Sequence, residues 1–326
     1  DNYLRWIYAS FVGSRAGSNT LFDDVLGEFY PEHKDKEQNE RLPEEKAQDI
    51  LNTTKKIQAE VRIARKLLDG SWPFESSQPI TAWDRKRLSL LVRELGLTVT
   101  MPLLLASLEL GEKKFSKIVQ LLEMFLFRYK VVASAHMTAV ITILHKHSTL
   151  IRNNPSSYDI NDLRSDLKEL QDERVDDKYF KESLENNLKY KSGGGNKPIK
   201  YFLMTLEHYR RWYKDGADGA PVCRDKTRVY DFTDTTIEHI YPRNADDSDK
   251  NEELELLKNE FGNLTFMGPS DNVAGDNDTF TSKHRIFEES SVGLNKDIAK
   301  NDEWTSKEVE ERKNKLLEMA CTLFTA

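Results

Sequence analysis

The sequence predicts a mainly α chain, in which a helical N-terminal domain precedes a C-terminal domain of the α+β class. Apolar residues recur at helical spacing through most of the first 190 residues. A glycine-rich break follows at "KYKSGGGNKP", and short β-prone segments appear only after it. We therefore expect two domains, an α-helical domain at residues 1–190 and a mixed domain at residues 191–326.

The longest helical pattern of the N-terminal half runs from Glu44 to Leu68. Its apolar residues follow one another at steps of seven, four, three and four, which keeps one helix face apolar, and Gly70 is placed to end the helix. Further helical patterns occupy residues 83–96, 113–132, 136–147 and 159–171. No run of alternating strands interrupts them, so the sequence predicts an irregular helical domain.

The C-terminal half alternates helical and β-prone segments after the glycine-rich break, which is either a domain linker or a loop between helices. Helices are expected at residues 199–214, 251–261, 280–290 and 305–324. Strands or turns are expected at residues 227–232, 235–240 and 262–267. Two short strands and a following helix are thus the predicted centre of this domain.

Charge and cysteine content limit the function classes. The chain carries 48 Lys and Arg against 55 Asp and Glu, a net charge of −7, so a nucleic acid must be met by a local basic patch. Cys223 and Cys321 are in no ligand-like spacing, which argues against a disulfide framework or a zinc site and favours the cytoplasm. No apolar run reaches the roughly 20 residues of a membrane span, so no membrane partner is expected.

A basic and aromatic stretch runs from Lys189 to Lys214, where the single acid is Glu207. Interleaved cations and aromatic rings are typical of a track for a phosphate backbone. The alternative is a core helix with a solvated basic face, and the sequence leaves both open. The two histidines of "HKH", His145 and His147, point in different directions on a helix, so we expect surface or packing residues there rather than metal ligands.

Polar residues of the C-terminal half form an ordered series. In chain order it contains Glu238-His239, Pro242, Gly262-Asn263-Leu264, Asn272, Phe280 and Lys283. The first pair lies in a short β-prone run, "TTIEHIYPRN", that Pro242 stops.

This series resembles the C-terminal nuclease domain of the GmrSD-type restriction family, which reads Glu/Asp-His-Ile-x-Pro, Gly-Asn-Leu, Asn and Phe-x-x-Lys. That domain belongs to the wider His-Asn-His (ββα-metal) endonucleases. The resemblance covers roughly residues 199–326 and implies a ββα-metal core, with DNA as the substrate. The family's N-terminal nucleotide-hydrolysing domain has no counterpart here, so we expect a fragment whose partner is that domain; a homo-oligomer stays open.

The chemistry of phosphodiester hydrolysis explains these residue types, because it needs a base for the attacking water and a cation for the developing charge. The resemblance implies that His239 is the general base and that Glu238 and Asn272 supply oxygen ligands to Mg²⁺ or Mn²⁺. It implies that Asn263 braces the loop carrying His239 or holds its ring. The final member is Asn rather than His, and Asn277 competes with Asn272 for the ligand role. The expected DNA contacts are Lys200, Arg210, Arg211 and Lys283.

The resulting hypothesis is a metal-dependent endodeoxyribonuclease that nicks or cleaves phage or modified foreign DNA in prokaryotic defence. The alternative is a non-catalytic helical interaction or regulatory module whose nuclease motif is vestigial. For Lys283, a solvated lysine at the start of a helix is the alternative to a phosphate contact. The sequence leaves open which DNA is recognised and whether one strand or both are cut.

Overall fold

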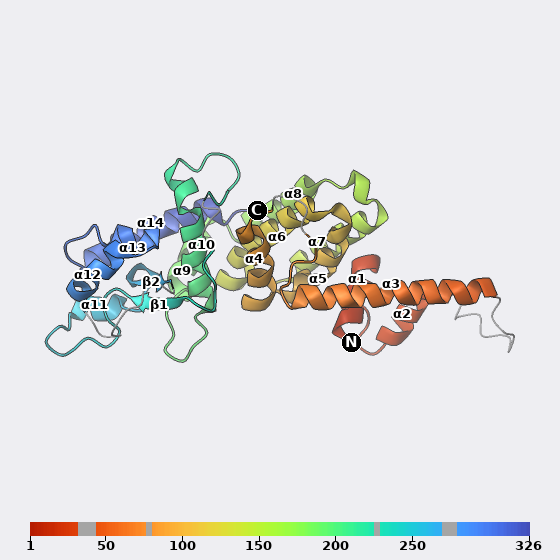
Figure 1. Cartoon of the computed structure of the whole chain (residues 1–326), viewed down its shortest axis with the longest axis horizontal. Coiled ribbons are helices and arrows are strands. Elements are labelled where there is room, and N and C mark those ends of the chain that lie inside the picture. The colour runs from red at the N-terminus through yellow and green to blue at the C-terminus, as the bar shows by residue number, and fades with distance from the viewer. Residues whose placement is uncertain (32–43, 76–79, 225–228, 269–278) are drawn as a thin grey trace. The chain divides into compact units, whose positions relative to one another are not determined.

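The computed structural model describes residues 1–31, 44–75, 80–224, 229–268 and 279–326, and this part of the chain is mostly helical with one two-stranded sheet (Figure 1). The predicted mainly α class is confirmed. The chain divides into two compact units. Unit 1 comprises Asp1–Glu123, His136–Leu170 and Ala326, and unit 2 comprises Met124–Ala135 and Gln171–Thr325. The domain boundary predicted between residues 190 and 191 stays a prediction.

Unit 1 is built of helices. They are α1 (Asn2–Val12), α2 (Leu21–Phe29), α3 (Glu44–Leu68), α4 (Ala82–Ser89), η2 (Leu90–Glu94), η3 (Thr98–Thr100), α5 (Met101–Ser107), η4 (Leu108–Leu110), α6 (Glu112–Leu126), α7 (Thr138–Asn153), η6 (Pro155–Ser157) and α8 (Ile160–Arg174). The ends of α6 and α8 pass into unit 2. Helix α5 is buried along its whole length and contacts α1, α3 and α7, which makes it the centre of the unit.

Helix α3 begins and ends where its apolar spacing predicts, and it is the long helix in orange in Figure 1. Gly70, just past its end, has φ +70°, a left-handed conformation that glycine adopts without the steric penalty of a side chain. A Cβ at this position would also lie 2.8 Å from the Cα of Ser89. The helix therefore stops at the glycine for a conformational and a packing reason.

Unit 2 contains the sheet and the helices around it. Its elements are η5 (Phe127–Val132), α9 (Asp177–Asn187), α10 (Lys197–Lys214), β1 (Thr236–His239), α11 (Glu252–Leu257), η7 (Phe261–Asn263), β2 (Leu264–Met267), α12 (Phe280–Glu289), α13 (Gly293–Ile298) and α14 (Ser306–Leu323). Strands β1 and β2 are antiparallel, with His239 opposite Leu264 and Glu238 opposite Thr265. Helices α10 and α13 contact β2, and α14 contacts η7. Two strands alone are marginal in water, so these helices stabilise the sheet.

The core of unit 2 is a cluster of apolar side chains from the segment after β1, from β2, from the last helices and from the turn before α14. It contains Ile240, Tyr241, Ala245, Leu254, Met267, Phe280, Phe287, Ile298, Trp304 and Val309. Thr279 caps the start of helix α12 by accepting a hydrogen bond from Ser282 N, and α14 is preceded by a capping box between Thr305 and Glu308. These caps fix where the two helices begin. Whether β1, β2 and α12 form the predicted ββα-metal core stays a prediction.

The β-prone segment at residues 227–232 forms no strand in its described part, residues 229–232. Tyr230 instead packs edge-on against Phe266 with ring centroids 5.2 Å apart, and its hydroxyl donates to Ser291 O at 3.1 Å. Phe232 is also buried. The alternation of apolar residues therefore reflects side chains that anchor an irregular segment on the core, without a neighbouring strand to pair with.

Among the described residues no single helix is long and apolar enough to cross a bilayer. The helices Ala82–Glu94 and Thr98–Leu110, which are bent by 114° relative to each other, have sufficient length and apolar composition only when taken together. Neither Cys223 nor Cys321 is part of a disulfide bond.

Candidate nuclease site

His239 ends strand β1 and is 7% exposed. Its Nε2 lies 3.4 Å from Asn259 Oδ1, and its ring meets the ring of Tyr190 edge-on at 4.6 Å. Because Nε2 is directed at an acceptor, Nδ1 is the nitrogen that can accept a proton. The ring is thus held by two residues from outside the strand pair.

The pKa of His239 is lowered to about 4, and burial of the ring is the largest cause. The positive charges of Arg243, Lys283 and Lys258 also lower this pKa, whereas the hydrogen bond to Asn259 opposes the shift. The imidazole is therefore uncharged near neutral pH. An uncharged imidazole is the form that a general base requires.

Asn263 braces the segment that follows His239. Its Oδ1 accepts from Tyr241 N at 2.8 Å and from Trp304 Nε1 at 3.0 Å, and its Nδ2 donates to the carbonyls of Tyr241 and Lys258 at 3.0 and 2.9 Å. All four hydrogen bonds of the amide are made in a fully buried position. Asn263 is expected either to brace the loop that carries His239 or to hold the histidine ring. It braces the segment after His239, and the residue that contacts the histidine ring is Asn259.

The glycine before Asn263 allows helix α14 to come close. A Cβ at Gly262 would lie 2.5 Å from Val309 O, so a side chain there would push α14 away. From α14, Arg312 Nη1 reaches back to the carbonyls of Phe261, Gly262 and Leu264 at 3.1, 2.9 and 2.7 Å. The motif Gly-Asn-Leu is therefore held on both sides, by its own amide side chain and by Arg312.

Glu238 and Lys283 form a buried ion pair. Lys283 Nζ donates to Glu238 Oε1 at 2.5 Å and to His239 O at 2.9 Å, and the lysine side chain is 0% exposed. Lys283 lies on the first turn of α12, so the pair ties this helix to the end of β1. In this position the ammonium is turned away from solvent, which favours a positioning role over the predicted phosphate contact.

A small pocket of about 100 Å³ opens at the end of β1. It is lined by Tyr190, Ile237, Glu238, His239, Arg243 and Asn244. Liquid water occupies about 30 Å³ per molecule, so the pocket has room for about three waters or a hydrated ion. Arg243 Nη1 donates to Tyr190 Oη at 3.4 Å, which places a cation at the same pocket as the histidine.

The predicted metal ligands are only partly described. Asn272 and its competitor Asn277 lie outside the described residues. Within the described ranges no group of three or more His, Cys, Asp or Glu is arranged to hold a metal ion. Magnesium commonly binds through one or two carboxylates with waters and substrate phosphate as its other ligands, so Glu238 suits it chemically, although Lys283 already holds one of the carboxylate oxygens.

The four predicted DNA contacts do not form one exposed cluster. Lys200 donates to Thr235 O and lies over the ring of Phe232, and Arg210 is paired with Asp297 at 2.6 Å. Lys283 is buried, and Arg211 is the exposed member of the four. Three aromatic residues of the same stretch, Tyr201, Tyr209 and Trp212, are at most 1% exposed, whereas Tyr190 and Tyr213 are half-buried. Helix α10 is thus a core helix, which is the alternative that the sequence left open.

Sequence reasoning missed the residues that complete the site. Asn259, Tyr190 and Arg243 surround His239, and Trp304 bonds to Asn263. The sequence around Asn259 and Arg243 does not mark them as site residues, because polar residues of these types are also common in surface loops. The packing expectation for His147 is confirmed, since its ring nitrogens bond to Tyr158 Oη at 2.9 Å and Asp166 Oδ2 at 3.0 Å.

Comparison with known families identifies the class. Residues 159–319 match the family model described as GmrSD restriction endonucleases, C-terminal domain. His239, Asn263 and Lys283 all lie in this matched part, which defines the class as a restriction endonuclease domain. Residues 159–319 are therefore a C-terminal domain of the GmrSD-type restriction family. No curated protein matches the chain.

Proposed function

We propose that the chain is a metal-dependent DNA endonuclease that nicks or cleaves DNA at the pocket beside His239. The observation that carries this proposal is a buried, uncharged imidazole that shares a small pocket with a carboxylate and an arginine, inside a domain of a restriction endonuclease family. Such a pocket contains a base, a ligand for a hard cation and a cation for phosphate.

Each residue has a distinct role in this mechanism. His239 Nδ1 accepts the proton of the attacking water, while Asn259 holds Nε2–H and keeps the tautomer. Arg243 attracts the scissile phosphate, and Glu238 would hold Mg²⁺ or Mn²⁺, which supplies neutralisation of the developing charge. Asn263 and Lys283 position the end of β1 without touching the substrate.

The biological setting is part of the same proposal. The family description supports a role in restriction, which we extend to prokaryotic defence against phage or modified foreign DNA in the cytoplasm. The nucleotide-hydrolysing domain expected from the resemblance would act with this nuclease domain.

A second candidate is a non-catalytic module with a vestigial motif. The observation that favours it is the Glu238–Lys283 ion pair, because an ammonium bound to the carboxylate opposes the approach of a metal cation. The two candidates differ in metal-dependent turnover.

Plasmid cleavage distinguishes the candidates. The purified chain should convert supercoiled plasmid to nicked or linear DNA with Mg²⁺ or Mn²⁺ and leave it intact in excess EDTA. His239→Ala should slow cleavage by about 10² to 10⁴, the usual loss for a general base, while DNA binding and the melting temperature change little. His284→Ala, which removes a half-exposed imidazole of the same unit, is the matched control.

Three results would contradict the proposal: cleavage that persists in EDTA, full activity of His239→Ala, or equal losses in both histidine variants. Absence of cleavage with either metal on plasmid and on phage DNA would favour the non-catalytic module.

A further inference from the structure

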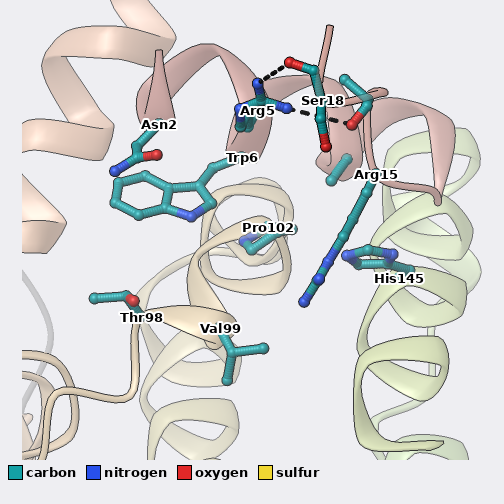
Figure 2. Close-up of a pocket in the computed structure, with 11 residues that line it drawn as sticks. Asn2, Arg5, Trp6, Arg15, Ser18, Thr98, Val99, Pro102 and His145 are labelled. Carbon is teal, nitrogen blue, oxygen red and sulfur yellow. Dashed lines mark hydrogen bonds between the residues drawn. The ribbon is translucent and has the colours of Figure 1, made fainter. Parts of the chain in front are cut away.

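A second and larger pocket, of about 490 Å³, lies within unit 1 (Figure 2). Its walls come from α1, from the loop after α1, from η3 with the start of α5, and from α7. Pockets that bind small organic ligands measure about 300–1,000 Å³, so its size suits such a ligand. It shares no residue with the pocket beside His239.

The residues that line the pocket carry positive charge and no acid. None of the described residues that line it is Asp or Glu, and its two arginines are Arg5 and Arg15. Arg5 is fixed in the wall, because it donates to the carbonyls of Ala16, Gly17 and Ser18 at 3.3, 3.2 and 3.1 Å. In a chain of net charge −7, a pocket with two guanidinium groups and no acid suits an anion.

Arg15 is the cation that can meet a ligand. It makes no hydrogen bond or ion pair with any residue that the structure describes, and its side chain is exposed. In Figure 2 it extends along one side of the pocket, beside the ring of His145. A guanidinium in this position presents several donors to an incoming phosphate or carboxylate.

His145 adds an acceptor next to these donors. Its side chain is buried, burial lowers its pKa, the charge of Arg15 lowers it further, and a hydrogen bond with the Gly13 backbone raises it. The ring is therefore uncharged near neutral pH, and with one nitrogen donating to Gly13 the other is an acceptor. The ligand thus meets donors and an acceptor side by side, which suits a group with N–H donors as well as an anion.

The opposite side of the pocket is aromatic and apolar. Figure 2 shows the indole of Trp6 across from Arg15, with Pro102 between them and the side chain of Asn2 beside the indole. A nucleobase stacks favourably on an aromatic side chain, and a carboxamide can bond to the polar edge of a base. An aromatic ring on one side and a cation on the other match a flat heterocycle joined to a phosphate.

We propose that this pocket binds a nucleotide unit, an aromatic base linked to a phosphate, either as a free nucleotide or as part of a DNA strand. Trp6 and Asn2 receive the base, Arg15 receives the phosphate, and His145 accepts a hydrogen bond from an O–H or N–H group of the ligand. The proposal is independent of the nuclease site, since it concerns other residues of unit 1.

Calorimetric titration of the whole chain tests the proposal. The protein carries His239→Ala so that DNA is not cut, and the ligands are the four deoxynucleoside monophosphates, deoxyadenosine and inorganic phosphate. At least one monophosphate should bind at one site, and about tenfold or more tighter than deoxyadenosine or inorganic phosphate, because only it contacts both sides of the pocket. Its binding should change tryptophan fluorescence, and Trp6→Phe should remove that change.

Variants locate the site. Arg15→Ala should weaken monophosphate binding about 10- to 100-fold, the range expected for a lost charge-assisted hydrogen bond. Arg62→Ala, which removes an exposed arginine of α3 outside the pocket, should leave it unchanged. Displacement of the monophosphate by a short single-stranded oligonucleotide identifies a DNA strand as the source, and failure of the oligonucleotide to displace it identifies a free nucleotide.

The proposal is overturned by any of three results: no binding of any monophosphate at millimolar concentration, equal effects of Arg15→Ala and Arg62→Ala, or inorganic phosphate binding as tightly as the nucleotide. None of these results depends on whether the chain cleaves DNA.

Discussion

Replacing His239 should change how the stability of the protein depends on pH. The buried imidazole has a pKa of about 4 in the folded chain, against about 6.5 for histidine in an unfolded chain. Between pH 4 and pH 6.5 the histidine is protonated in the unfolded chain but remains unprotonated in the folded chain. The contribution of His239 to stability is therefore fully present above pH 6.5 and is lost as the pH falls towards 4.

The magnitude follows from the two pKa values. A difference of about 2.5 units corresponds to about 3 kcal/mol, of which about 2 kcal/mol is already lost at pH 5. His239→Gln removes the titrating group and keeps a side chain that can bond to Asn259. Between pH 7 and pH 5 the free energy of unfolding should therefore fall by about 2 kcal/mol less in the variant than in the wild type.

Urea unfolding at both pH values measures this difference through tryptophan fluorescence. Trp304, whose indole bonds to Asn263, reports on the unit that contains His239. Every other titrating group is common to both proteins, so its effect cancels in the comparison. Equal losses in wild type and variant, or an NMR titration of the His239 ring with a midpoint near 6.5, would show that the imidazole is not desolvated and refute the reasoning.

Two further predictions concern the residues that hold the end of β1. Lys283→Met should destabilise the protein by about 3–5 kcal/mol in thermal or urea unfolding, because it leaves Glu238 buried without its ammonium. Adding Glu238→Gln should recover most of this loss, and a double variant as unstable as the single one would contradict the ion-pair explanation. Asn263→Ala should lower the free energy of unfolding by more than about 3 kcal/mol, since it leaves two donors and two acceptors unsatisfied. Asn263→Asp, which keeps only the two accepted bonds, should fall between the alanine variant and the wild type.

The sequence alone determined those features that depend on neighbours in the chain. The spacing of apolar residues located α3 to the residue, and the β-prone run before Pro242 contains all of β1. Helical and strand periodicities are local, because each follows from the direction in which successive side chains point. The order of the polar motifs likewise led to the family that the comparison confirms.

Only the tertiary structure decided which of those polar residues meet. Lys283 binds Glu238 across 45 residues of chain, and Asn259 meets His239 across 20. The same distinction applies to α10, whose basic and aromatic composition fits both a DNA track and a core helix until the burial of its rings is known.

The pocket of unit 1 is the clearest case of this division. Its lining joins residues near the start of the chain to His145, and no local pattern relates Trp6, Arg15 and that histidine. Helical periodicity indicates which side chains face inward. The charge of a pocket depends instead on which charged residues of the packed helices line it. The composition of the lining is a property of the folded unit, because the lining residues come from segments that lie far apart in the sequence.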